Sequence, residues 1–213
     1  MKRLFILGVN GNARDVLDAA RILCKRDPDF PKPAGFLDDK AEPNQQVDGL
    51  PVLGPISLAR EIADALFVNA IGSPESYRAK PKILAKSGVP DTSFLSVVHP
   101  SAAVSPSATL DAGSVVLAHS AVGSGARVGR HVMVLQNCVI SHDAVVEDFS
   151  VLATGVLLSG GVSIGRNAYL GSGCTVRGGI RVGEGALVGM GSAVLKEIPP
   201  GEVWIGNPAR RLR

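Results

Sequence analysis

The sequence predicts a small α/β domain followed by a parallel β-helix, and three observations support this prediction. In the first hundred or so residues, short apolar runs alternate with segments of helical spacing. From Val104 to Val194, an aliphatic residue then occupies every sixth position without interruption. Aromatic residues make up only 4% of the chain, as a narrow core without room for rings requires. A period of six is typical of a chain that turns one corner per repeat and stacks equivalent residues.

The elements of the first part follow in order along the chain. Residues 3–9 are a short apolar run, which predicts a strand, and residues 10–26 have the apolar spacing of a helix. Residues 33–39, 49–57 and 63–73 predict a second strand, a third element and a strongly apolar fourth strand. Residues 79–88 predict a helix closed by Gly88, and residues 93–100 lead into the first repeat. Strands that alternate with helices imply a small parallel α/β domain of Rossmann-like character.

The repeats of the second part predict a prism with three sides. Three six-residue sides make a coil of about eighteen residues, so the repeats form about five coils. The aliphatic residues are expected to point inward: Val104, Leu110, Val116, Val122, Val128, Val134, Ile140, Val146, Leu152, Leu158, Ile164, Leu170, Val176, Val182, Val188 and Val194. Smaller residues four places later, from Ala108 to Ser192, share the interior. Glycines are expected to let the backbone bend at the corners: Gly113, Gly123, Gly125, Gly129, Gly155, Gly165, Gly173, Gly183 and Gly191.

We therefore expect a domain at residues 1–97, a β-helix at residues 98–197 and a capping tail at residues 198–213. The net charge of +3 is mild and no block of basic residues occurs, which disfavours nucleic acid as a partner. The first apolar run is too short for a signal peptide and no stretch is long enough to span a membrane, so we expect a cytoplasmic enzyme without a membrane partner.

The three cysteines are expected to be structural. Cys138 and Cys174 occupy the same inward position two coils apart, roughly 9.6 Å from each other, which is too far for a disulfide. Cys24 is expected to be a buried helix residue. None of the three has the spacing of a metal site, so no metal is expected.

Polar residues follow the first two strands, where such folds bind ligands. Gly8 and Gly11 lie between the first strand and the first helix, where backbone N–H groups can face an anion or simply form a tight turn. The glycine pattern of dinucleotide-binding folds is incomplete, which disfavours NAD. Asp38 and Asp39 end the second strand, where they either face a ligand or form a solvated turn.

Several tracts together resemble one family across nearly the whole chain. They are GVNGNA at residues 8–13, GFLDD at residues 35–39, AIGSPESYR at residues 70–78, VVHPSA at residues 97–102 and the unbroken repeats. The chain resembles the hexapeptide-repeat sugar O-/N-acetyltransferases, which include sialic acid O-acetylating enzymes and nucleotide-aminosugar N-acetyltransferases of glycan and lipopolysaccharide biosynthesis. The resemblance implies a left-handed β-helix, a homotrimer and acetyl-CoA as co-substrate, with no tightly bound cofactor.

The resemblance also implies where the nucleotide-linked sugar binds. Asn10, Gly11 and Asn12 would contact it, Asp38 and Asp39 would reach its base or ribose, and Gly72 would lie beside it. Many relatives carry histidine in place of Asn12, so the contact to the phosphates can differ here.

Acetyl transfer to an amine needs a base and a donor for the oxyanion. Of the four histidines, His119, His131 and His142 lie on repeats, at corners where we expect them to point outward or along an edge. Asp143 follows His142, and a carboxylate beside an imidazole fixes its tautomer and raises its basicity. The pair matches the family's general base and its acid. A second family histidine, nine residues later, is Val151 here.

The resemblance places coenzyme A in a groove between two neighbouring β-helices. Backbone N–H groups of Gly160 and Gly161 are candidates for the oxyanion donor. Ser172 and Met190 stack on adjacent coils, as a long ligand parallel to the axis requires. Pro208 and an arginine of the tail would lie near the adenine nucleotide, while the tail also covers the edge of the last coil.

The sequence favours an N-acetyltransferase that acts on the amine, at C4, of a nucleotide-linked amino-deoxy sugar. GDP-perosamine and a UDP-linked bacillosamine precursor are both compatible with the sequence. An O-acetyltransferase of the sialic acid type is the alternative. A non-catalytic trimeric scaffold is the third hypothesis, and its zinc-dependent form is disfavoured because three converging histidines are absent from the sequence pattern.

Overall fold

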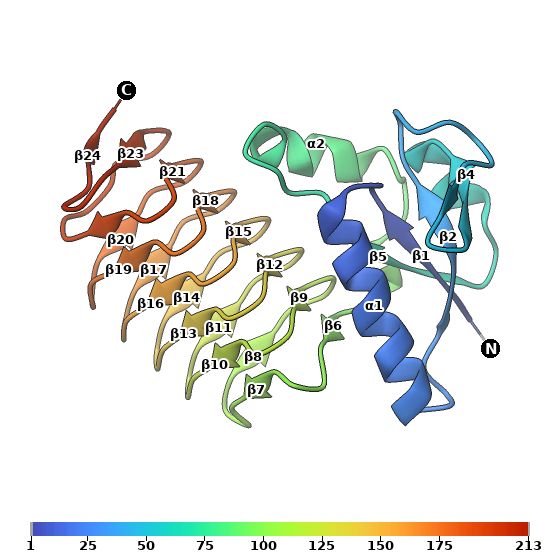
Figure 1. The fold of residues 1–213 in the computed structure, drawn as a ribbon, viewed down its shortest axis with the longest axis horizontal. Coiled ribbons are helices and arrows are strands. Elements are labelled where there is room, and N and C mark those ends of the chain that lie inside the picture. The colour runs from blue at the N-terminus through green and yellow to red at the C-terminus, as the bar shows by residue number, and fades with distance from the viewer. Residues whose placement is uncertain (1, 213) are drawn as a thin grey trace.

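The computed structural model describes residues 2–212, in which a small sheet with helices lies beside a stack of coils (Figure 1). The sheet has the strand order β3-β4-β2-β1-β5, and its pairs are parallel except β3 with β4. Its strands are β1 (Arg3–Leu7), β2 (Lys32–Leu37), β3 (Gln46–Val47), β4 (Leu50–Gly54) and β5 (Ala65–Asn69). This confirms the expected strands, and the third element is β4 followed by a short helix at Ile56–Glu61.

Helix α1 spans Gly11–Arg26, as its apolar spacing predicts. The Asn10 side chain caps it by accepting a hydrogen bond from the N–H of Ala13, and Val16 and Leu17 are buried against the sheet. Cys24 lies on this helix as expected but is only partly buried, because the last turn extends beyond the sheet's cover. After β5 come three more short helices, Tyr77–Ala79, α2 (Lys80–Ala85) and Asp91–Ser93.

The β-helix has three parallel faces, and each strand pairs with the strand one coil later, as Val139 does with Leu157. We call the first the docked face: β6 (Val97–Val98), β9 (Val115–Val116), β12 (Met133–Val134), β15 (Val151–Leu152), β18 (Tyr169–Leu170), β21 (Leu187–Val188) and β23 (Val203–Ile205). The apolar face is β7 (Ala103–Val104), β10 (Ala121–Val122), β13 (Val139–Ile140), β16 (Leu157–Leu158), β19 (Thr175–Val176) and β22 (Ala193–Val194). The charged face is β8 (Thr109–Leu110), β11 (Arg127–Val128), β14 (Val145–Val146), β17 (Ser163–Ile164) and β20 (Arg181–Val182).

The six-residue period is confirmed as an inward stack. Every aliphatic residue of that register from Val116 to Val194 is at most 2% exposed, whereas Val104 and Leu110 of the first coil are half-buried. Cys138 and Cys174 are free thiols inside this core, where burial raises the pKa of Cys138 to about 11 and that of Cys174 to about 12.

The corners repeat a left-handed backbone conformation. Asp143, Asn167 and Gly161 are among the corner residues with positive φ, which explains why Gly, Asn, Asp and His gather there. Gly123 is needed at its corner for space, as expected, and not for a left-handed conformation. Its φ is not positive, and it must be glycine because a Cβ would lie 2.8 Å from the N atom of His142 on the next coil.

The docked face packs directly against the α/β part. Val115, Met133 and Val151 share one buried cluster with Leu4 and Val16 of the sheet and helix α1. At the far end, β23 pairs with β21, the antiparallel strand β24 (Arg210–Arg211) follows, and Ala209 enters the core, so the tail covers the last coil as expected. No helix within residues 2–212 is long and apolar enough to cross a membrane.

Candidate functional site

His142 lies at the corner between the apolar and charged faces, in the turn between β13 and β14. Its Nδ1 is 2.9 Å from Oδ2 of Asp143, and the two side chains are 69% and 74% exposed. The corner gives Asp143 a positive φ of 58°, which turns its carboxylate back toward the preceding residue. When Nδ1 donates its hydrogen to Asp143, Nε2 is left free to accept a proton.

Gly160 stacks above His142 on the next coil and supports the imidazole ring. A Cβ at residue 160 would overlap the Cε1 and Nε2 atoms of His142, so the ring lies directly against the glycine backbone. The N–H of Gly161 donates to the carbonyl of His142 at 3.0 Å, so it is occupied by the coil itself. Of the two expected oxyanion donors, only Gly160 keeps an N–H without a backbone acceptor among the described residues.

The other repeat histidines differ from His142. His119 is exposed, as expected. The expectation that His131 points outward is wrong: it is 2% exposed and lies between the rings of Phe94 and Phe149. The α/β part covers this corner, and burial lowers the pKa of His131.

The sugar-binding candidates of the first part gather where β1, β2 and β5 end. Asn10 caps α1 and its Nδ2 donates to the carbonyl of Ala70 at 3.4 Å. The Nδ2 of Asn12 donates to the carbonyl of Gly72 at 3.4 Å, which joins the start of α1 to the end of β5. Gly11 has open space around its Cα, and the first turn of α1 holds no acidic residue, so an anion can approach there.

The two aspartates have different surroundings. Both carboxylate oxygens of Asp38 accept backbone N–H groups, from Val9 at 2.9 Å on one oxygen and from Lys40 and Ala41 on the other. Asp38 therefore shapes this edge through the backbone instead of offering a free carboxylate to a ligand.

Asp39 accepts the N–H of Ile56 at 3.0 Å and lies 2.6 Å from Nζ of Lys86. Burial disfavours its charged form, but the hydrogen bonds from Lys86 and Ile56 outweigh this and lower the pKa of Asp39. It stays a carboxylate near neutrality, and it is exposed at the edge where a ligand would bind.

The same edge touches the β-helix. Gly72 packs so closely against the docked face that a Cβ would lie 2.8 Å from a methyl group of Val151 and 3.2 Å from Sδ of Met133. Val151, which replaces the second family histidine, is thus fully buried under the α/β part and lies on a different face from His142.

The expected coenzyme A residues lie on another corner. Ser172 and Met190 are exposed between the docked and apolar faces, and Met190 is 78% exposed. Pro208 is exposed in the tail. Gly160 and Gly161 are at the His142 corner, so one chain does not bring the two sets together.

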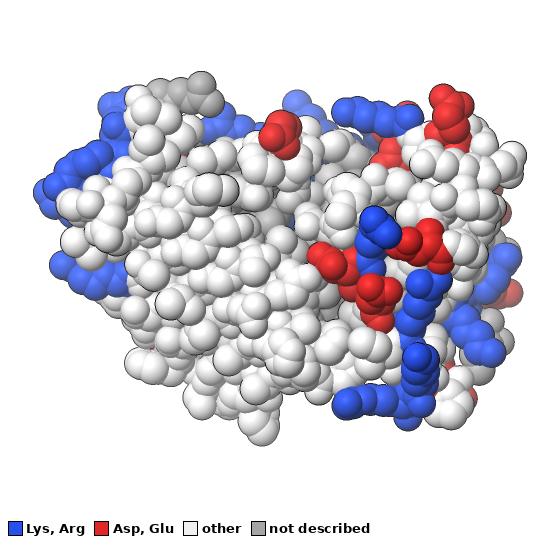
Figure 2. Space-filling model, viewed as in Figure 1, with Lys and Arg blue, Asp and Glu red and all other residues white. Residues whose placement is uncertain are grey.

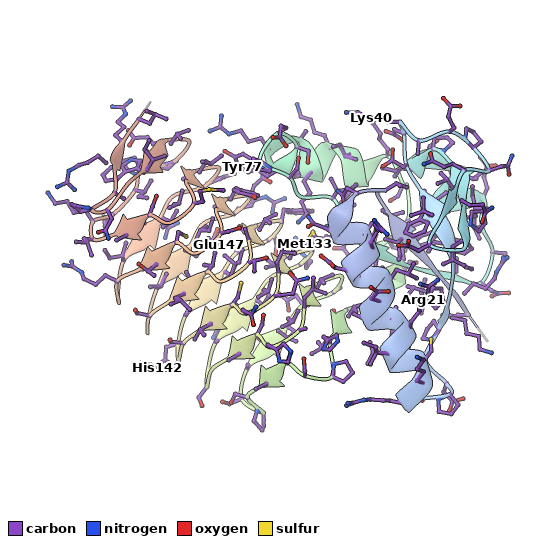
Figure 3. The ribbon with its side chains drawn as sticks, in the orientation of Figure 1. Arg21, Lys40, Tyr77, Met133, His142 and Glu147 are labelled. Carbon is purple, nitrogen blue, oxygen red and sulfur yellow. The ribbon has the colours of Figure 1, made fainter. Side chains whose placement is uncertain are left out.

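His142 is also remote from the edge where β1, β2 and β5 of its own chain end, which we call the sugar-binding edge because the candidates for sugar binding gather there. Its corner joins the two faces that the α/β part leaves uncovered, so it is the corner opposite the docked face. Figure 3 shows His142 at an outer edge of the coils, on the side away from α1. The family resemblance predicts active sites at subunit interfaces, which agrees with this separation. Sequence reasoning missed Lys86 and Lys80, because nothing in the local pattern marks their tertiary contacts.

The comparisons with known proteins agree with this architecture. Residues 161–196 match the model for the hexapeptide repeat of succinyl-transferase. No curated protein matches the sequence significantly. Among solved structures, the acetyltransferase domain of PglB from Neisseria gonorrhoeae, in complex with acetyl coenzyme A, is 29% identical with a TM-score of 0.87, over 99% of both chains.

Two further structures match over the whole chain. PerB from Caulobacter crescentus, in complex with CoA and GDP-perosamine, is 28% identical with a TM-score of 0.85, over 100% of this chain and 98% of that one. WeeI from Acinetobacter baumannii is 25% identical with a TM-score of 0.84, over 100% of both chains. With its uninterrupted hexapeptide repeats and these full-length matches, the chain is similar over its whole length to hexapeptide-repeat sugar acetyltransferases.

Proposed function

We propose that this protein transfers an acetyl group from acetyl-CoA to the C4 amine of a nucleotide-linked amino-deoxy sugar. The observation that carries the proposal is the full-length likeness to PglB with acetyl coenzyme A and to PerB with CoA and GDP-perosamine. The PerB complex favours a GDP-linked sugar as the first substrate to test. Free cysteines agree with a reducing compartment, so we place the reaction in the cytoplasm.

His142 is the general base of the proposed reaction, with Asp143 orienting its ring. The imidazole Nε2 takes a proton from the sugar amine as the nitrogen attacks the thioester carbon. The N–H of Gly160 stabilises the tetrahedral oxyanion. The carbon–sulfur bond then breaks, and the proton returns to the leaving thiolate of coenzyme A, which gives the amide and free CoA.

The active site is composite and forms between copies of the chain. The sugar-binding edge and His142 lie on opposite sides of one chain, so a neighbouring chain must bring its His142 corner to this edge. The same packing would bring Ser172 and Met190 of one copy toward Gly160 of the next, which forms a groove for coenzyme A. We therefore propose a homotrimer of left-handed β-helices with three sites at its interfaces.

We keep the division into a nucleotide-sugar domain at residues 1–97, a catalytic β-helix at residues 98–197 and a capping tail as part of the proposal. The buried contact of Gly72 with Val151 and Met133 supports a nucleotide-sugar domain that is fixed on the β-helix.

The test combines binding and turnover. The purified protein is heated with GDP, UDP, dTDP or CMP, and the nucleotide that stabilises it most identifies the substrate series. The matching 4-amino sugar nucleotide is then incubated with acetyl-CoA, and free thiol and product mass are measured. We expect one thiol released per amide formed. Turnover of a hydroxyl sugar without turnover of the amine would contradict the proposal and indicate the O-acetyltransferase.

A further inference from the structure

A buried lysine anchors the α/β part on the β-helix. Lys80, the first residue of α2, has no exposed surface, and its Nζ donates to the backbone carbonyl of His131 at 2.6 Å. No salt bridge to this amine forms among residues 2–212. A buried ammonium without a counter-ion is strongly unfavourable, and burial lowers the pKa of Lys80 to about 7.

His131 belongs to a corner that carries several hydrogen bonds between the two parts. We call it the seam corner; it joins the charged and docked faces and consists of Gly113, His131, Phe149, Asn167 and Gly185. A neighbouring segment lies along it, because the Tyr77 hydroxyl and the Arg78 guanidinium both donate to the carbonyl of Gly185 and Asn167 donates to the carbonyl of Arg78.

The charged groups around Lys80 leave its amine without a partner. Asp91 lies 2.6 Å from Arg130 and 3.4 Å from Nε2 of His131. Asp148 lies 2.7 Å from Arg130 and 3.4 Å from Arg166. Both carboxylates therefore pair with arginines, and the residue whose carbonyl accepts the Lys80 hydrogen bond, His131, is itself buried.

The segment that Lys80 anchors begins at the sugar-binding edge. Gly72 forms one end and packs on Val151 and Met133, and Lys80 forms the other end. At the end of the same helix, Lys86 pairs with Asp39 at 2.6 Å. A shift of this segment would therefore move both Gly72 and the group that holds Asp39.

We propose that Lys80 is a positioning residue: its uncharged amine holds residues 72–86 on the seam corner, and protonation of this amine releases them and weakens nucleotide-sugar binding. Only the effect on nucleotide-sugar binding rests on the proposed function. The release itself concerns the docking of two parts of the chain.

The direction of the pH dependence follows from the burial of the amine. In the released segment, water surrounds the amine and restores its ordinary pKa of 10.5. A group whose pKa is lower in the docked state binds fewer protons there, so docking is favoured at high pH. The opening constant should thus rise about tenfold for each pH unit as the pH falls from 9 to 7, and level off below that.

Hydrogen exchange on the full-length protein tests the release. The exchange of backbone amides in residues 72–86, corrected for the intrinsic pH dependence, gives the opening constant between pH 7 and 9. We expect the tenfold slope in the wild type and a flat profile in Lys80→Met. Lys80→Arg, which stays charged, should be more open than the wild type at pH 9. Lys82→Met, an exposed lysine of the same helix, is the matched control and should keep the wild-type slope.

Binding of GDP and of acetyl-CoA tests whether the release of residues 72–86 weakens nucleotide-sugar binding. Between pH 9 and 7, we expect GDP binding to weaken more in the wild type than in Lys80→Met, while acetyl-CoA binding changes equally in both. Equal exchange slopes in wild type and Lys80→Met would overturn the proposal. Different exchange slopes with a GDP affinity that shifts equally in both proteins would overturn only the link to nucleotide binding. Failure of GDP and the other nucleotides to bind at any pH would instead count against the proposed function.

Discussion

At the scale of single residues, the corner that holds His142 also determines how the ring is oriented. Asp143 fixes Nδ1, and Gly160 supports the opposite edge of the imidazole without a side chain of its own. The His142 imidazole is thus oriented by two neighbours that the coil geometry supplies, one from the same corner and one from the coil above.

Replacement of His142 by alanine should lower kcat at least a hundredfold, because loss of a general base costs about 10² to 10⁴ in rate. Asp143→Asn should cost on the order of tenfold, since it orients the base without moving the proton. Steady-state kinetics, with acetyl-CoA binding and molecular mass as controls, measure both. If His142→Ala keeps more than a tenth of wild-type kcat, another residue must be the general base. The exposed His119 of a neighbouring copy would then be tested, since the buried His131 is no longer a candidate.

Gly160→Ala should lower kcat while the coil stays folded. The new methyl group would occupy the space of the His142 ring and displace it, and a displacement of about 1 Å can cost on the order of 10² in rate. The φ of Gly160 is not in the left-handed region, so alanine fits the backbone. We expect an unchanged melting temperature beside the loss of kcat; wild-type activity in Gly160→Ala would show that the ring position does not matter.

Asp39→Ala should raise the KM of the nucleotide sugar and leave that of acetyl-CoA nearly unchanged. The carboxylate is exposed at the sugar-binding edge and is held by Lys86 and Ile56, whereas the proposed coenzyme A groove lies along the coils. Asp38→Ala is the comparison, and it should instead lower the melting temperature because three backbone N–H groups would lose their acceptor. Equal increases of both KM values in Asp39→Ala would argue against its role at the nucleotide.

At the scale of the element, each two-residue strand has one inward and one outward side chain. In β14, Val146 is 1% exposed, while Val145 faces outward and is only half-buried. Val146→Ala should lower the free energy of unfolding by about 1.5–3 kcal/mol, the value of burying such a side chain. Val145→Ala, its neighbour, should cost less than about 1 kcal/mol by the same measure. Denaturant unfolding of both variants checks this, and similar losses would mean that the inward register is wrong.

At the scale of the whole molecule, the apolar face is the surface that most needs a partner. Its outward side chains include Val139 and Leu157, 37% and 44% exposed, and no charged residue lies on its strands. Figure 2 shows a broad surface without charge over the coils, in contrast to the α/β part. A contiguous apolar surface of this kind is typical of an interface.

We expect a light-scattering mass three times the chain mass of 22.0 kDa at micromolar concentration. Leu157→Glu should reduce this mass and abolish turnover together, although His142 is intact, because the site needs two copies. A wild-type mass near that of one chain would contradict the trimer, and full activity in a monomeric Leu157→Glu would contradict the composite site.

The sequence by itself determined the periodic features of this protein. A six-residue period can be satisfied only by a stack of coils, so the inward register from Val116 to Val194 and the pairing of His142 with Asp143 follow from neighbours along the chain. Helix α1 could also be predicted from the sequence, because its cap and its apolar spacing are local features. Only the tertiary structure decided which corners of the β-helix lie against the α/β part and which face solvent. It buried His131 under Phe94 and Lys80, and it enclosed Asp38 in backbone hydrogen bonds. It also set the sugar-binding edge on the side opposite His142, because contacts between distant segments depend on how the two parts pack, and a short stretch of sequence does not encode that packing.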